Sequence, residues 1–148
     1  EDYVDTLATL AVLEGYMTAL ASDTIDAEGV ALLKEINGRM AAAWTQRDVG
    51  RFGRLNREFH FAIYRFCPNP LMVEFAKAAW ARLEHVRQTS IALLPGRGET
   101  SLAEHDSIIA ALEARDTKAR IEKIAREHKL ATIRHFRKWE AEHGGAPD

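Results

Sequence analysis

Three of the six histidines occupy positions from which they could jointly bind a metal ion. His60, His105 and His128 each fall on the apolar stripe of a different predicted helix, close to residues such as Phe59 and Ile109. A polar side chain at a core position carries a desolvation cost unless something pairs with it. Neutral imidazole is a favoured ligand of divalent transition metals, and three such ligands leave coordination positions open. A metal ion is therefore one partner that all three imidazoles could share.

Asn56 extends this set, because it lies one helical turn before His60 on the same predicted helix face. Two further histidines are candidates. His135 lies two turns after His128 on about the same face, and His85 is on another predicted helix. The alternative for each histidine is a hydrogen bond to a carbonyl or carboxylate within the core, with no metal involved.

Charged residues also occupy predicted inward positions. Glu14 interrupts the apolar stripe of the first predicted helix, which favours a paired structural carboxylate. Arg82 is expected to face inward on the fourth predicted helix, with Arg87 near its end. A guanidinium group facing a cavity can bind a carboxylate through two parallel hydrogen bonds. Both arginines are therefore candidate ligand-binding residues, although Arg82 could instead pair with Glu14 or a similar acid.

The elements that position these side chains are all predicted to be helices. Apolar residues recur at helical spacing throughout, and no window alternates apolar and polar residues as a strand would. The first helix is expected over 3–21. The starts of the other five are expected at Asp26, Asp48, Asn69–Pro70, Ser101 with Glu104 as a capping box, and Asp116 or Thr117.

The fourth of these helices is expected to reach residue 92, with an inward stripe of Leu71, Phe75, Ala79, Arg82 and Val86. The segment 94–98 is the main helix breaker and the expected loop. Short connections favour an antiparallel bundle, an architecture that readily builds a site from inward side chains on facing helices. The spacing therefore predicts an all-α, antiparallel bundle of six helices.

Composition narrows the class of protein. A chain of 148 residues is about one domain, and a net charge of -2 gives no basic footprint for nucleic acid. The only cysteine, Cys67, excludes an internal disulfide framework and fits a reducing, cytoplasmic location. The longest apolar runs are shorter than a bilayer span, so no membrane partner is expected.

Several short segments, in this order and spacing, resemble the C-terminal effector-binding (FCD) domain of GntR-type transcription regulators of the FadR subfamily. They are Asn56-Arg57-Glu58-Phe59-His60, Asn69-Pro70-Leu71, Glu104-His105 followed by Ile108 and Ile109, and His128. The resemblance covers essentially the whole chain. It implies an all-helical bundle of six or seven helices around a cavity that often holds a divalent metal and binds a small organic acid.

Carried over to this sequence, the resemblance implies a metal site made of Asn56, His60, His105 and His128. Zinc is the metal first expected, with nickel or manganese as alternatives. Residues 1–148 would be a single effector-binding domain, and a winged helix-turn-helix domain outside this chain would bind operator DNA. A homodimer is also expected.

Two positions depart from the family pattern. Asn56 stands where metal-binding members often have Asp, so the site loses a charge that an acidic effector could supply. Leu10 stands where many relatives carry an arginine one turn before the glutamate. If that arginine holds effector in relatives, Arg82 or Arg87 is expected to do so here.

The predicted function is therefore ligand sensing in a bacterial transcription regulator, without enzymatic activity. One alternative is a mononuclear helical-bundle metalloenzyme, because three histidines and an open position can activate water. The di-iron type is disfavoured, since no Glu-x-x-His motif precedes the three histidines. A second alternative is a structural dimerisation bundle without metal, in which the histidines are hydrogen-bonded core residues.

Overall fold

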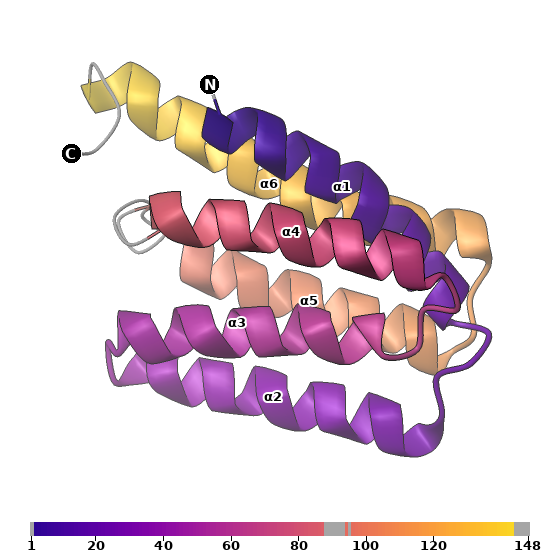
Figure 1. Cartoon of the computed structure of the whole chain (residues 1–148). Helices are drawn as coiled ribbons and strands as arrows, with labels where there is room; N and C mark the ends of the chain where they lie inside the picture. Colours follow the sequence, from indigo (N-terminus) through magenta and orange to yellow (C-terminus); the bar gives the residue numbers. More distant parts are fainter. Residues whose placement is uncertain (1, 88–93, 95, 144–148) are drawn as a thin grey trace.

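The fold was analysed in a computed structural model that describes residues 2–87, 94 and 96–143, except for the side chains of 85–87. Within those residues there are six α-helices and no strand, which confirms the all-α prediction. The helices are α1 (Asp2–Ala21), α2 (Ala27–Thr45), α3 (Val49–Tyr64), α4 (Pro70–Arg87), α5 (Arg97–Glu113) and α6 (Lys118–His143). Consecutive helices run in opposite directions, as an antiparallel bundle requires (Figure 1).

The helices pack as two groups that share the centre of the bundle. The first helix, α1, lies along α6 and against α4, whereas α2 lies against α3 and α5, and α5 also contacts α6 (Figure 1). One apolar cluster includes Leu33, Phe59 and Leu112, and the other includes Leu10 and Trp80. His60, which belongs to the site described below, contacts both clusters through the rings of Phe59 and Trp80.

Three helix starts are capped by the side chains that the sequence indicates. Asp26 and Asp48 each accept a hydrogen bond from the backbone N–H three residues later, at 2.7 and 2.9 Å. Asn69 Oδ1 accepts from the N–H groups of Leu71 and Met72 at 3.2 Å each. These bonds satisfy N–H groups that have no partner within the helix, and so they fix where α2, α3 and α4 begin.

The start of α5 differs from the prediction. This helix begins at Arg97, inside the expected loop, and Ser101 is a buried residue of its second turn instead of its N-cap. Gly96 holds a left-handed backbone (φ 72°) before the helix. The ring of Trp44 lies 2.5 Å from where a Cβ on Gly98 would stand, so only glycine lets the two helices approach this closely. The early start places Arg97 in the bundle interior.

The inward face of α4 is rotated by about one residue from the predicted stripe. Leu71 and Phe75 are each 56% exposed, while Ala76 and Trp80 are fully buried. The indole is the largest apolar group on this helix, and its N–H reaches buried acceptors, so its burial sets the orientation of the helix. The expected continuation of this helix to residue 92 lies outside the described residues.

The first helix is also long and apolar enough to cross a membrane by length and composition, which corrects the expectation that no segment is. More than half of that stretch is buried by the other helices, and the buried part includes Glu14. Packing within the bundle therefore accounts for its apolar character.

Candidate metal centre

Three helices bring the predicted histidines together. His60 comes from α3, His105 from α5 and His128 from α6, and their side chains are buried, with at most 4% exposed. His128 Nε2 lies 3.2 Å from His105 Nε2 and 3.2 Å from His60 Nε2. One nitrogen from each imidazole lies within 4.8 Å of the other two. In the described part of the chain, this is the group of side chains best suited to hold a metal ion.

The outer nitrogen of each imidazole faces an oxygen. His105 Nδ1 lies 3.1 Å from Asn37 Oδ1, and His128 Nδ1 lies 2.6 Å from Glu104 Oε2. His60 Nδ1 lies 3.4 Å from a carboxylate oxygen of Glu14. An acceptor at Nδ1 favours the tautomer that carries its hydrogen there and leaves the Nε2 lone pair free to bind a metal. The lone pairs that could bind a metal are then on the three Nε2 atoms, and that of His128 lies 3.2 Å from each of the other two.

The spacing of these nitrogens fits a common ion. Two nitrogens bound to one zinc ion at a tetrahedral angle lie about 3.3 Å apart. His128 Nε2 is 3.2 Å from both other Nε2 atoms, close to that value. Lone pairs at this distance repel one another, so the arrangement favours a proton or a cation between them. The donor set of neutral imidazoles suits a first-row transition metal.

Asn56 supplies a second observation that fits a metal site. Its side chain is 7% exposed, and its Oδ1 has no hydrogen-bond partner among the described residues. It lines an internal cavity of about 20 Å³ together with His128. A buried carbonyl oxygen without a partner costs about 1–3 kcal/mol, and such an oxygen is a possible metal ligand.

The environment of His105 keeps its imidazole neutral. Burial is the main cause of a pKa well below the ordinary value of 6.5, and electrostatic interactions with His128, Lys129 and Arg97 lower it further. The ring stacks on Phe59 with 3.8 Å between the ring centroids, so its plane is fixed by packing. A neutral imidazole held in one orientation is the form that binds a metal.

Glu14 connects the first helix to the centre. Its carboxylate accepts hydrogen bonds from the Trp80 indole N–H, at 2.8 Å, and from the Tyr64 hydroxyl. Its other oxygen lies 3.2 Å from Lys129 Nζ and faces His60. The prediction of a paired, structural carboxylate at this position is consistent with these contacts, which also orient a candidate ligand.

Arg97 and Glu104 form the third group around the histidines. The Arg97 guanidinium is 2% exposed and donates to Glu104 Oε2 at 2.8 Å, to Thr132 Oγ1 at 3.0 Å and to the His128 carbonyl at 3.0 Å. Burial raises the pKa of Glu104, and the nearby Arg97 opposes this shift. The two side chains therefore fix His128 from the side opposite the shared centre.

Other candidate residues lie elsewhere. Arg82, expected to face inward, is 65% exposed and pairs with Asp2, so the expectation of a cavity-facing guanidinium is wrong. The rotation of α4 described above is the physical reason. His135 is half-buried, and its Nδ1 bonds to the carbonyl one turn before it. The side chains of His85 and Arg87 lie outside the described residues.

Four residues around the histidines were not identified from the sequence: Asn37, Arg97, Glu104 and Lys129. For two of them, the spacing along the helix did indicate an inward position. Asn37 follows Leu33 by four residues, and Lys129 follows Ala125 by four, so both continue apolar stripes. Arg97 gave no such signal because its segment was expected to be a loop.

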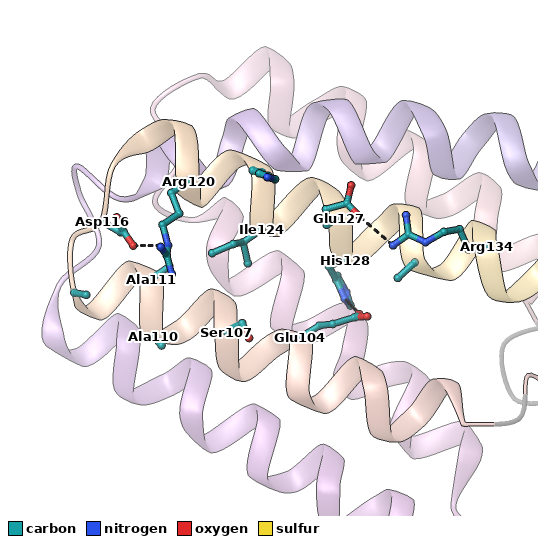
Figure 2. A pocket seen from close by; sticks show the side chains of 13 residues that line it. Glu104, Ser107, Ala110, Ala111, Asp116, Arg120, Ile124, Glu127, His128 and Arg134 are labelled. Carbon is teal, nitrogen blue, oxygen red and sulfur yellow. Dashed lines mark hydrogen bonds and ion pairs between the residues drawn. The ribbon is translucent and has the colours of Figure 1, made fainter.

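A surface groove of about 760 Å³ lies between α5 and α6, and His128 is the one of the three histidines that lines it. Its lining includes Glu104 and His128, which point at each other where the two helices face (Figure 2). Glu104 is 27% exposed, whereas the acceptors of the other two histidines are buried. The His128 side of the centre is thus the side nearest to solvent.

Comparison with known proteins places the chain in a family. Residues 5–131 match the family model described as the FCD domain. The fold is similar to that of E. coli McbR/YncC, with a TM-score of 0.75 and 23% sequence identity. That similarity covers 87% of this chain and 64% of the neighbour, so the chain spans less than two thirds of the neighbour's length. No curated protein matches the sequence. Because the family match extends over most of the chain, this protein belongs to the FCD domain family.

Proposed function

We propose that this domain senses a small organic acid at a divalent metal ion. His60, His105 and His128 would hold the ion through Nε2, and the Asn56 amide oxygen would be a weaker fourth ligand. The observation that carries this proposal is the convergence of three buried Nε2 atoms whose Nδ1 atoms all face acceptors. Imidazole ligands suit zinc, which is the first choice, and also nickel; manganese is the third candidate.

The bound ion would supply open coordination positions for a carboxylate. The buried polar groups around the ion would provide the rest of the selectivity for the effector. Arg82 no longer belongs to this proposal, because it pairs with Asp2 on the outside of the bundle. Arg87 remains a candidate from the sequence alone.

The sensing domain would act on a separate DNA-binding domain in a cytoplasmic, homodimeric regulator. An acid can shift operator binding only by as much as it prefers one arrangement of the two domains over the other. Of the helices that carry the histidines, α5 packs against α6, and α3 and α5 both pack against α2, so a change at the centre would reach the surface through this packing.

Metal analysis and calorimetry test the proposal. The protein is stripped with chelator, repleted with zinc, nickel or manganese, and compared with His105→Ala and with His143→Ala. His143 is exposed and far along α6, so its loss should leave one bound ion per chain. His105→Ala should lose the ion. The proposal is wrong if the wild type binds none of the three metals and also binds carboxylates with the same affinity as His105→Ala.

The metalloenzyme alternative is less well supported. Hydrolysis at a mononuclear centre needs a general base near the open coordination positions. Glu104 and Glu14 face the Nδ1 atoms of His128 and His60, on the outer side of each ring. The described group at the centre contains histidines and no carboxylate.

The structural alternative is a metal-free bundle. It predicts a thermal melt that neither chelator nor added zinc changes. A ligand that binds only the folded state must raise the melting temperature.

A further inference from the structure

A lysine lies at the edge of the histidine centre. Lys129 follows His128 on α6, and its side chain is only 4% exposed. Its Nζ lies 3.3 Å from His60 Nε2, the nitrogen proposed as a metal ligand, and 3.2 Å from Glu14 Oε2. The ammonium also lies 4.2 Å from the centroid of the Trp80 ring. Three neighbours therefore fix a positive charge beside the position that a cation would take.

This charge opposes metal binding. An ammonium and a divalent ion within a few ångströms repel each other, and the repulsion is stronger in a buried site than in water. Lys129 has little freedom to move away, because Glu14 and the Trp80 ring hold it inside the bundle. Its repulsion is offset only if negative charge enters the site together with the metal.

The buried charges nearby are already balanced without a metal. Lys129 pairs with Glu14, and Arg97 pairs with Glu104, so these two cations and two anions cancel. The proposed ligands are three neutral imidazoles and the neutral amide of Asn56. A divalent ion would thus leave two buried positive charges without a counter-charge, which is costly in a protein interior.

The internal cavity shows where an anion would enter. Its lining includes Asn56, Arg97, His128 and Lys129. Two of these are cations, and the cavity adjoins the histidine centre. At about 20 Å³ it has room for roughly one water-sized group. One carboxylate oxygen fits this cavity without any movement of the protein. The rest of an acid molecule would fit only if the side chains that line the cavity moved apart.

We infer that Lys129 makes metal binding at this centre depend on an anion, and that its ammonium binds the carboxylate that accompanies the metal. This inference rests on the proposed function. Metal and acid would then each raise the affinity for the other by the same factor, as linkage requires. Lys129 would take the role that the sequence suggested for an arginine on α4.

The experiment measures zinc affinity with and without a carboxylate probe. Zinc perchlorate is titrated into metal-free protein at constant pH, in buffer alone, with sodium acetate, or with acetamide as the neutral analogue. Acetate should raise the zinc affinity of the wild type by about tenfold, within the usual range of coupling between two ligands. Acetamide should not change it.

Removing the ammonium should remove this dependence. Lys129→Met should bind zinc in acetate-free buffer about tenfold more tightly than the wild type, and acetate should then change its affinity less than twofold. Lys138→Met is the matched control, because Lys138 is 77% exposed on the same helix. Its acetate dependence should equal that of the wild type.

A second variant covers the case in which Lys129→Met fails to fold because Glu14 is left unpaired. Glu14→Gln/Lys129→Met removes both charges and keeps an oxygen that can accept from Trp80 and Tyr64. Acetate should raise its zinc affinity less than that of the wild type, because the ammonium that binds the carboxylate is absent, although the two charges of the ion itself still favour an anion.

The outcomes separate the two proposals. A wild-type zinc affinity that acetate leaves unchanged, or an equal acetate effect in the variants, overturns the role of Lys129 while the metal centre stands. No zinc binding by any of the proteins, with or without acetate, overturns the metal centre itself.

Discussion

Asn37 on α2 fixes the tautomer of His105 on α5. The two amide hydrogens of Asn37 donate to the Leu102 carbonyl at 3.2 Å and to Asp106 Oδ1 at 2.8 Å. The amide oxygen must then face His105 Nδ1, 3.1 Å away, and accept its hydrogen. The lone pair of His105 Nε2 is left for the shared centre. An asparagine outside the ligand set thus determines which nitrogen of a candidate ligand is available.

Replacing this amide should weaken metal binding without unfolding the protein. Asn37→Ala removes the acceptor at His105 Nδ1, and losing such an outer partner typically lowers metal affinity about 10–100-fold. Competition with a coloured zinc chelator measures the change. Lys34→Ala, one turn earlier and exposed on the same helix, is the control and should bind zinc as the wild type does. Equal affinities for both variants would contradict the assigned tautomer.

Asn56 should be the position where a single substitution strengthens the site. Asn56→Asp places a carboxylate where the amide oxygen has no hydrogen-bond partner among the described residues. It supplies the negative charge that we propose an acid supplies in the wild type. Zinc affinity without acetate should therefore rise, by about tenfold or more, and acetate should no longer increase it. Calorimetry with and without acetate measures both effects.

Asn56→Leu tests the same position in the opposite direction. This side chain has a similar size and no polar atom, so the metal-free protein no longer buries an unsatisfied oxygen. Its free energy of unfolding should rise by about 1 kcal/mol in chelator, and its zinc affinity should fall. A variant that loses stability in chelator would show that the Asn56 oxygen has a stabilising role in the metal-free fold.

The metal-free protein should lose stability as the pH falls below about 6.5. The pKa of His105 is well below 6.5 in the folded state, mainly because of burial, whereas the unfolded chain has the ordinary value. The unfolded state therefore binds more protons in this window, and stability rises with pH. Urea unfolding in chelator at pH 7.5 and 5.5 measures the difference.

The variant His105→Gln identifies the group responsible. It cannot be protonated, so the loss of stability between pH 7.5 and 5.5 should be smaller than in the wild type. His143→Gln removes an exposed histidine and should retain the full loss. The raised pKa of Glu104 acts in the opposite direction, because with this group the folded state binds more protons than the unfolded state as the pH falls. An unchanged pH dependence in His105→Gln would exclude His105 as the cause.

Much of the fold could be predicted because its signals are local. Asp26, Asp48 and Asn69 precede apolar helical stripes, and each caps the helix that it was expected to cap. The three histidines could be placed inward for the same reason, since each lies three or four residues from apolar neighbours. Local spacing identifies the buried face of a helix when apolar residues recur on that face along the whole helix.

Other features could not be predicted because they depend on contacts between distant segments. The orientation of α4 is set by Trp80, whose indole N–H bonds to Glu14, 66 residues away. The start of α5 depends on Trp44 packing over Gly98. On α4, apolar residues at helical spacing fit two neighbouring helix faces. Only the contact between Trp80 and Glu14 shows which of the two is buried. Of the acceptors around the histidines, Glu14 was expected to face inward, whereas the pairing of Asn37 with His105 and of Glu104 with His128 depends on such contacts between helices.

Arg97 and Arg82 should respond very differently to the same substitution, although both pair with a carboxylate. Arg97 is 2% exposed and bonds to Glu104, Thr132 and the His128 carbonyl, so Arg97→Met leaves buried acceptors without a donor. It should lower the free energy of unfolding by about 2–4 kcal/mol, somewhat less than for a fully buried ion pair because Glu104 is partly exposed.

Arg82→Met is the matched variant. It removes an exposed pair with Asp2, and such pairs contribute little to stability. Urea unfolding should show no change, and zinc and acetate binding should equal those of the wild type. Loss of acetate binding in Arg82→Met would restore this residue to the effector site and contradict its exposed position on α4. An Arg97→Met protein as stable as the wild type would show that Glu104 can hold His128 without its guanidinium partner.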